Sequence, residues 1–285
     1  MADQQPGSDA SAGKPAPAKP VLRSDIAWSS PDAIGVHGYD LCNDLLGKID
    51  FGAMAFLSVA GRLPNPNESR LFNALVITLV EHGIVPSTLA ARMTYAGAPE
   101  AMQAAVAAGL LGLGSVFVGS TEGSARMLSE ALPPLAEGKA PPDARALETL
   151  AQAIVKRHRD ERRIVPGLGH PIHKPVDPRT VRLFEIARET GFHGRYVALM
   201  EAVSVAAATS FGKTLPINAT GAIGALVCEL GLPWEVSRGL GVMARAVGLV
   251  GHLLEESRRP LAMPLWHRVE EEATGHLRGT FREDR

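Results

Sequence analysis

The amino-acid sequence predicts an all-α protein. Long segments repeat apolar residues every three or four positions and are bounded by asparagine, aspartate, proline and glycine, which is typical of capped helices. Alternating patterns are scarce, and aromatic residues, which favour strands, make up only 5% of the 285 residues. We therefore expect roughly ten to twelve helices of ordinary length, with no internal repeat.

The first elements follow from turn residues and helical spacing. Residues 34–50 indicate a short extended piece and then a short helix. Residues 50–64 have helical spacing and stop at a glycine and a proline, as helix ends do. Residues 65–83 begin with asparagine caps and Pro66, and their apolar period is close to 3.6. The sequence therefore predicts two consecutive helices after the extended piece.

The middle and C-terminal parts are also expected to be helical. Residues 100–119 predict a buried core helix, because glycines and Ser115 interrupt the longest apolar run, which makes it unsuitable as a membrane span. After residue 260 we expect a polar tail. The remaining helices are expected within residues 120–132, 141–161, 178–191, 194–212, 213–231 and 233–260.

Composition places the chain among ordinary globular proteins. Hydrophobic residues make up 46%, charged residues 21%, and the net charge is −1, so neither a nucleic-acid nor a membrane partner is expected. Residues 1–22 are polar and rich in Pro, Ala and Ser, which predicts a disordered tail and no secretory signal. Cys42 and Cys228 could pair, but buried free thiols in a reducing cytoplasm are the favoured interpretation. No cysteine or histidine spacing indicates a metal site.

One loop stands apart from the helical pattern. Residues 164–179, IVPGLGHPIHKPVDPR, carry two glycines, four prolines, His170, His173 and Arg179. Glycines let the backbone approach a ligand, and prolines stiffen the loop, so it could aim His170 at a substrate as an acid–base group. The alternative is a solvated turn without a function, which is our preferred interpretation of His173.

Three other segments carry histidine or arginine residues that could serve a site. His82 ends an apolar helix beside Glu81, and Arg245 lies seven residues before His252 on one helix face. A buried arginine needs a partner, which could be a bound carboxylate or an internal Asp or Glu. Arg259 at a helix end is explained by the helix dipole alone. Together these residues favour a pocket for a small polycarboxylate.

Several sequence motifs resemble those of a known enzyme family. The loop VPGLGHPIHKPVDPR resembles the Pro-Gly-x-Gly-His…Asp-Pro-Arg loop of citrate synthases and citryl-CoA lyases. The resemblance covers nearly all of residues 24–270 and is strongest to the short citryl-CoA lyase branch, like the C-terminal module of ATP-citrate lyase. Four further motifs fall in the family's order, at residues 36–64, 81–83 (EHG), 212–218 (GKTLPIN) and 244–256 (ARAVGLVGHLLEE).

The resemblance implies a fold and an assembly. The family fold is all-helical, with a large domain and a small domain, and it forms an obligate homodimer in which the partner completes each pocket. Here the large domain would comprise residues 23–119 and 221–285, and the small domain residues 120–220. No metal or redox cofactor is implied, because a coenzyme A thioester is itself a substrate.

The resemblance also implies a reaction and its residues. The family joins or cleaves a carbon–carbon bond between the acetyl group of acetyl-CoA and the ketone of oxaloacetate. His170 matches the histidine that exchanges a proton with the ketone or alkoxide oxygen, and His82 matches a histidine at the oxaloacetate end. Carboxylate-binding arginines match Arg179, Arg245 and Arg259, the last of which reaches the neighbouring subunit's site. Coenzyme A-binding backbone matches Val165, Pro166, Gly167, Leu168, Gly169, Gly212, Lys213, Thr214 and Leu215.

Two departures from the family pattern bear on activity. Thr220 stands where the family's aspartate moves the acetyl methyl proton, and threonine is no base near neutral pH. Phe117 or Val118 replaces a family histidine. The chain could thus be a lyase with another proton donor, such as His173 or Glu122, or a lyase for a related hydroxy-acyl-CoA, or a binding protein without turnover. The sequence does not select the acyl chain, the keto acid or the direction.

Overall fold

The computed structural model describes residues 22–115, 119–134, 140–170 and 174–279. The predicted tail at 1–22, apart from Leu22, and the positions of Phe117, Val118 and His173 lie outside these ranges. The chain divides into two compact units, one reaching to Lys48 and one from Ile49 onward. The domain division at residues 120 and 220 stays a prediction.

The first unit holds a small antiparallel sheet. Its strands are β1 (Ala27–Ser29), β2 (Ile34–Val36) and β3 (Tyr39–Asp40), in that order, followed by a short π-helix over Leu41–Leu45. The extended piece and short helix expected at 34–50 are therefore confirmed, whereas β1 had no signal of its own. Cys42 is exposed in the short helix, so the expectation of a buried thiol there was wrong; Cys228 is buried, and both cysteines are free.

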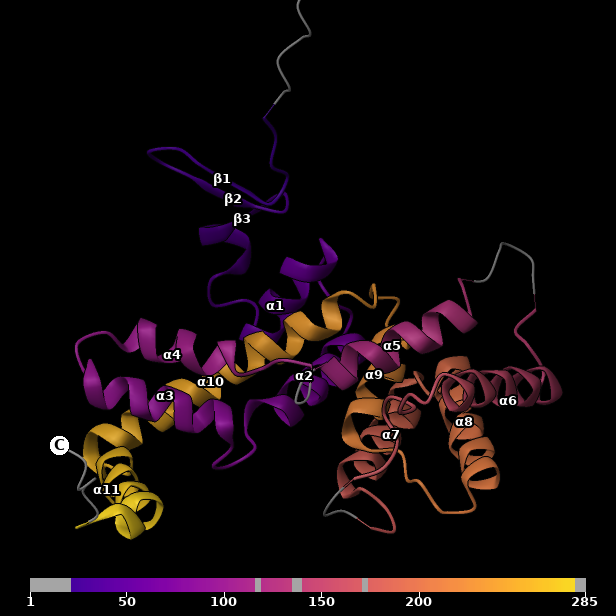
Figure 1. The fold of residues 1–285 in the computed structure, drawn as a ribbon. Helices are drawn as coiled ribbons and strands as arrows, with labels where there is room; N and C mark the ends of the chain where they lie inside the picture. Colours follow the sequence, from indigo (N-terminus) through magenta and orange to yellow (C-terminus); the bar gives the residue numbers. More distant parts are fainter. Residues whose placement is uncertain (1–21, 116–118, 135–139, 171–173, 280–285) are drawn as a thin grey trace, which may run out of the picture. The chain divides into compact units, whose positions relative to one another are not determined.

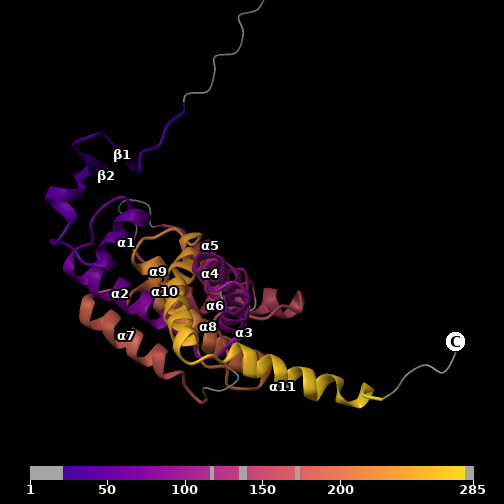
Figure 2. The same ribbon diagram turned by 90° about the vertical axis from the view of Figure 1, so that its left-hand side faces the viewer.

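The second unit is all-helical, as predicted (Figures 1 and 2). Its α-helices are α1 (Phe51–Ala60), α2 (Pro66–Val80), α3 (Pro86–Gly97), α4 (Met102–Leu111), α5 (Gly119–Ala131), α6 (Ala144–Asp160), α7 (Pro178–Thr190), α8 (Arg195–Phe211), α9 (Ala219–Glu229), α10 (Val236–Arg258) and α11 (Ala262–Thr274), with a 3₁₀ turn at Gly275–Leu277. Among the described residues no helix combines the length and apolar character needed to cross a membrane.

Local capping chemistry explains why these helices begin and end where they do. Asp50 accepts a hydrogen bond from the Ala53 backbone at 2.7 Å, and Gly61 ends α1 in the left-handed conformation with φ 72°. Asn65 and Glu68 form a reciprocal capping box at the start of α2. The predicted boundaries of these two helices are thus close to the observed ones.

Two helix predictions need correction. The buried helix expected at 100–119 is the shorter α4, in which Ala105 and Gly109 are buried while Leu111 is 87% exposed. Its alanines and glycines make the segment apolar without supplying side chains large enough to fill a core. The polar tail expected after residue 260 contains α11, which is mostly exposed.

The main core surrounds α9, which lies against α5, α7 and α8 and is buried along most of its length (Figure 1). Phe56 and Phe72 pack edge to face between α1 and α2, with ring centroids 5.2 Å apart. A smaller apolar cluster joins α3, α4 and α10. The start of α9 and the end of α2 both border the same cavity, which is the candidate site.

Candidate active site

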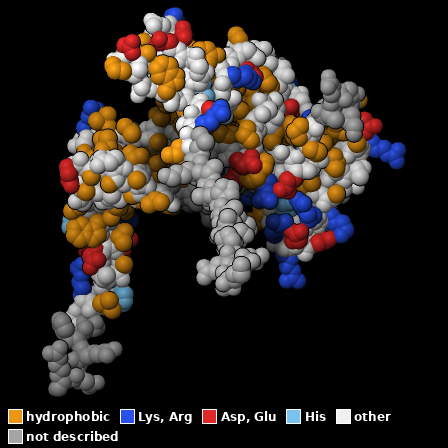
Figure 3. Space-filling view, turned by 90° about the horizontal axis from the view of Figure 1, so that it is seen from above, with side chains coloured by type: hydrophobic (Ala, Val, Ile, Leu, Met, Phe, Trp, Pro, Cys, Tyr) orange, Lys and Arg blue, Asp and Glu red, His pale blue; other side chains and the backbone are white. Residues whose placement is uncertain are grey.

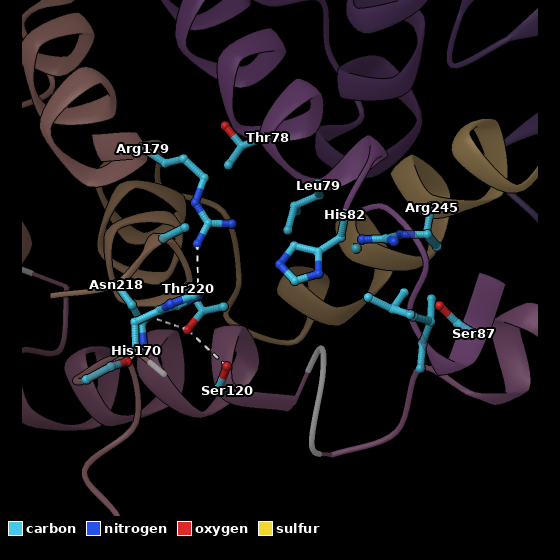
Figure 4. Close-up of a pocket in the computed structure, with 15 residues that line it drawn as sticks. Thr78, Leu79, His82, Ser87, Ser120, His170, Arg179, Asn218, Thr220 and Arg245 are labelled. Carbon is cyan, nitrogen blue, oxygen red and sulfur yellow. Dashed lines mark hydrogen bonds between the residues drawn. The ribbon is translucent and has the colours of Figure 1, made fainter. Parts of the chain in front are cut away.

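A cavity of about 370 Å³ gathers most of the residues predicted for catalysis and carboxylate binding. Its lining includes His82, His170, Arg179, Thr220 and Arg245, which come from five separate segments of the chain. In Figure 4, His170, Arg179 and Thr220 lie on one side, and His82 and Arg245 on the other. The fold therefore brings these five residues to one hollow.

The loop predicted to carry His170 is held rigidly against the start of α9. Gly169 donates a backbone hydrogen bond to the Pro216 carbonyl at 2.7 Å, and Asn218 donates one to the Gly167 carbonyl at 3.0 Å. Gly167 has φ 82°, and a Cβ added there would lie 2.5 Å from the Cα of Gly221. Only glycine fits this close crossing, which places Gly169 and His170 at the edge of the cavity.

A fully buried carboxylate, Asp177, orients the predicted carboxylate clamp Arg179. Arg179 donates to Asp177 from Nε at 3.0 Å and from Nη2 at 2.8 Å, and the same Nη2 lies 3.3 Å from His170 Nε2. Asp177 also accepts from the Ala219 backbone at 3.0 Å. Burial favours protonation of Asp177, but the hydrogen bonds from Arg179 and Ala219 outweigh it and lower its pKa. Asp177 is therefore ionised, and Arg179 is anchored on it.

Thr220, which replaces the family's aspartate, sits in a chain of neutral hydrogen bonds. Its hydroxyl donates to Asn218 Oδ1 at 2.7 Å and accepts from the Ser120 hydroxyl at 2.9 Å. Asn218 in turn donates from Nδ2 to the Gly169 carbonyl at 2.7 Å. Because the Thr220 proton is committed to Asn218, the part of the wall formed by Ser120, Asn218 and Thr220 is polar and uncharged.

Arg245 supplies a positive charge without a hydrogen-bonded carboxylate partner in the described chain at the opposite wall. Its Nε and Nη1 atoms are buried and have no hydrogen-bond partner within the described part of the chain. Burial lowers the pKa of Arg245, and the charge of Glu81 opposes that shift. The partner expected for Arg245 was either a bound carboxylate or an internal Asp or Glu. No internal carboxylate in the described ranges hydrogen-bonds Nε or Nη1.

Other predicted residues lie elsewhere. Arg259 is exposed at the end of α10, in a shallow hollow apart from the cavity. Glu122, a candidate proton donor, pairs with Arg238 and does not line the cavity. His252, which was expected to share a helix face with Arg245, contacts Glu81 and Arg92. Among the described residues, no three His, Cys, Asp or Glu side chains are grouped to hold a metal ion.

A second cleft, of about 350 Å³, borders the predicted coenzyme A segments. Val165, Leu168, Lys213 and Leu215 line it, whereas Pro166, Gly167, Gly169, Gly212 and Thr214 do not. Sequence reasoning missed the basic and aromatic side chains that complete its lining: Arg159, Arg162, Arg163 and Phe211.

Sequence reasoning also missed two polar residues that line the cavity, Ser120 and Asn218, and one behind its wall, Asp177. Asp177 had a visible signal, since an aspartate immediately before a proline is typical of a helix N-cap. Asn218 precedes α9 in the same capping role. Ser120 had no local signal, because its contact with Thr220 joins residues a hundred positions apart.

Comparison with known proteins finds solved structures with a similar fold. A solved citryl-CoA lyase from Hydrogenobacter thermophilus is 30% identical, with a TM-score of 0.76 over 93% of this chain and 96% of that chain. ATP citrate lyase from Methanothrix soehngenii, solved with citrate and coenzyme A, is 23% identical, with a TM-score of 0.65 over 84% of this chain and 39% of that chain.

Sequence comparison gives the family directly. Citrate synthase 2 of Bacillus subtilis is 25% identical over 210 residues, which is 73% of this chain but only 53% of that protein. The chain thus spans about half the length of this curated relative. The sequence profile of the citrate synthase C-terminal domain matches residues 47–264. The chain belongs to the citrate synthase family.

Proposed function

We propose that this protein cleaves citryl-CoA, or a close analogue, into a keto acid such as oxaloacetate and an acyl-CoA such as acetyl-CoA, or catalyses the reverse condensation. The observation that carries the proposal is Arg245, which lines the cavity and whose buried Nε and Nη1 atoms have no hydrogen-bond partner in the described chain. A substrate carboxylate supplies that partner. The 30% identity to a citryl-CoA lyase supports the same substrate class.

In the proposed cleavage, Arg179 and Arg245 hold carboxylates of the substrate from opposite walls of the cavity. His170 removes the hydroxyl proton, the ketone forms as the carbon–carbon bond breaks, and the electron pair passes to the thioester as an enolate. The enolate then takes up a proton from water, and His170 passes the proton it removed to solvent. His82 holds the keto-acid end beside Arg245.

The proposed coenzyme A site is the second cleft. Arg162, Arg163 and Lys213 offer positive charge for phosphates, and Phe211 offers an aromatic surface for the adenine ring. Figure 3 shows Lys and Arg side chains gathered on its right-hand side, which corresponds to the side of α6 and α8 in Figure 1. Leu168 lines this cleft and Gly169 the catalytic cavity, so one short loop borders both.

Thr220 favours a second candidate within the same family. No carboxylate is among the described residues that line the cavity, so the base that enolises acetyl-CoA in the family has no counterpart there. Ser120 and Thr220 could instead hydrogen-bond a polar group on a different acyl chain. The second candidate is therefore a lyase for a related hydroxy-acyl-CoA, or a protein that binds such thioesters without turnover.

We also propose a cytoplasmic homodimer. Arg259 lies outside the cavity of its own chain, as expected if it serves a partner's site. Apolar side chains are exposed nearby on α10, where Val247, Val250 and Leu254 are available to be covered by a second copy.

The experiment that tests this function is citryl-CoA cleavage by the purified protein, with oxaloacetate measured through malate dehydrogenase and NADH. We expect turnover in the wild type and its loss in His170→Ala. A folded protein that binds citryl-CoA without cleaving it would reject the lyase assignment for this substrate. A panel of hydroxy-acyl-CoA thioesters would then separate the second candidate from binding alone.

A further inference from the structure

We propose that Glu81 and His252 are positioning residues for His82, with Arg92 as their buried anchor. None of the three lines the catalytic cavity, but Glu81 precedes His82 directly in the chain. The kinetic part of this proposal rests on the proposed lyase function, whereas the structural part does not.

The anchor is an arginine that is almost fully inside the protein. Arg92 on α3 is 2% exposed, and its Nη1 donates to Glu256 at 2.7 Å while its Nη2 pairs with Glu255. Glu256 is itself buried and accepts from the Leu261 and Ala262 backbones at 2.9 and 2.8 Å. The carboxylates of Glu255 and Glu256 hold the Arg92 guanidinium, which α3 carries, against α10 and the start of α11.

The anchor determines which ring nitrogen of His252 carries the proton. Arg92 Nη2 lies 2.9 Å from His252 Nδ1, and because a guanidinium can only donate, Nδ1 is the acceptor. In the neutral ring the hydrogen is then on Nε2, which lies 2.8 and 2.9 Å from the two carboxylate oxygens of Glu81. His252 thus connects a buried cation to a carboxylate at the edge of the site.

The backbone next to Glu81 is held by the same helix. A Cβ added to Gly248 on α10 would lie 2.1 Å from the Val80 carbonyl, so α10 touches the last turn of α2. Glu81 then leaves the helix in an extended conformation, with φ −126° and ψ 145°. The contacts at Val80 and at the Glu81 side chain thus restrain the backbone from which His82 enters the cavity.

The variants His252→Leu and Glu81→Ala test this directly. Each variant removes the contact between Glu81 and His252. We therefore expect each to lower kcat/KM for citryl-CoA by a similar factor of roughly 10–100, and the double variant to show no further loss. Glu81 is half exposed, so its variant will fold even if His252→Leu does not. His252→Gln keeps a donor for Glu81 and should recover part of the activity. Binding of coenzyme A should stay unchanged in all of them.

NMR of the imidazole rings gives a readout that needs no turnover. We expect the His82 resonances, assigned with His82→Ala, to shift or broaden in both variants. The matched control is His193→Leu. His193 also faces a glutamate, with its Nε2 atom 3.6 Å from Glu201 Oε1, but it does not line the cavity. Folded variants whose His82 resonances match the wild type, or independent losses that add in the double variant, would overturn the positioning role. A wild type without turnover rejects the lyase proposal and leaves the NMR result to decide this one.

Discussion

Arg245 is the residue at which function and stability oppose each other. Its Nε and Nη1 atoms are removed from water without a protein partner in the described chain. An unsatisfied buried donor costs about 1–3 kcal/mol, and a bound carboxylate removes that cost. At this position stability is therefore given up so that an anion binds tightly.

Arg245→Met tests this opposition. The variant removes the buried charge and keeps the apolar stem, so we expect the ligand-free unfolding free energy to rise by about 1–3 kcal/mol. The stabilisation that citrate gives to the wild type should disappear. Denaturant unfolding with and without citrate measures both effects, and Arg238→Met, at an exposed pair with Glu122, is the control. A variant that is less stable and still responds to citrate would contradict the assignment.

Thr220 is the second decisive residue. In Thr220→Asp a carboxylate would occupy the first turn of α9, where the helix dipole and the Ser120 hydroxyl stabilise its ionised form. We expect citryl-CoA cleavage to rise by about 10²–10⁴-fold, the usual contribution of a general acid–base group. Thr220→Asn provides the same shape without the charge. An unchanged rate in both variants would favour a different acyl group as the natural substrate.

Two helices, α7 and α9, depend on one carboxylate. Asp177 accepts from the Arg179 backbone at the start of α7 and from the Ala219 backbone at the start of α9. Its pKa is lowered in the folded protein, so its contribution to stability is present above its unfolded pKa of about 3.9 and is lost as the pH falls through the folded value.

Asp177→Asn removes the charge, keeps one of the two accepting oxygens and replaces the other with an NH2 group that cannot accept. At pH 7 we expect the unfolding free energy to fall by about 1.5–3 kcal/mol, the contribution of charge-assisted hydrogen bonds. The difference from the wild type should narrow as the pH falls below about 4, because the Asp177 carboxyl then binds a proton in the unfolded chain while it is still ionised in the folded protein. Urea unfolding between pH 3 and 8 measures the difference. Asp143→Asn, an exposed cap with a 2.8 Å bond to Ala146, should show a much smaller effect.

Helices were predictable where local chemistry decides them. The caps at Asp50 and Asn65 are readable in sequence because the donor and acceptor lie within three residues. Residues 100–119 were harder, since an alanine- and glycine-rich run does not say which side is buried. The helix α11 was missed because Pro264 and the charged second half of the segment are typical of a polar tail. The Ser120–Thr220 contact depends on tertiary packing, which no local pattern encodes.

At the scale of the assembled molecule, the proposed homodimer makes a sharp prediction. If Arg259 completes the partner's site, Arg259→Ala and His170→Ala each lose activity alone but complement each other when mixed. In a mixed dimer one site carries both changes and the other carries neither. Random exchange of subunits should restore roughly a quarter of the wild-type activity. Mixed samples as inactive as either variant, with subunit exchange shown by mass spectrometry, would place Arg259 in its own chain's chemistry.

The shared carboxylate of Asp177 also has a mechanical consequence. The two oxygens of Asp177 bind the N-terminal ends of α7 and α9. Arg179 and Thr220 therefore cannot change their separation without breaking a contact to this buried carboxylate. Arg179 and the part of the wall around Thr220 therefore move together as one rigid unit. Any adjustment of the site to substrates of different length has to come from the opposite wall, where His82 and Arg245 lie.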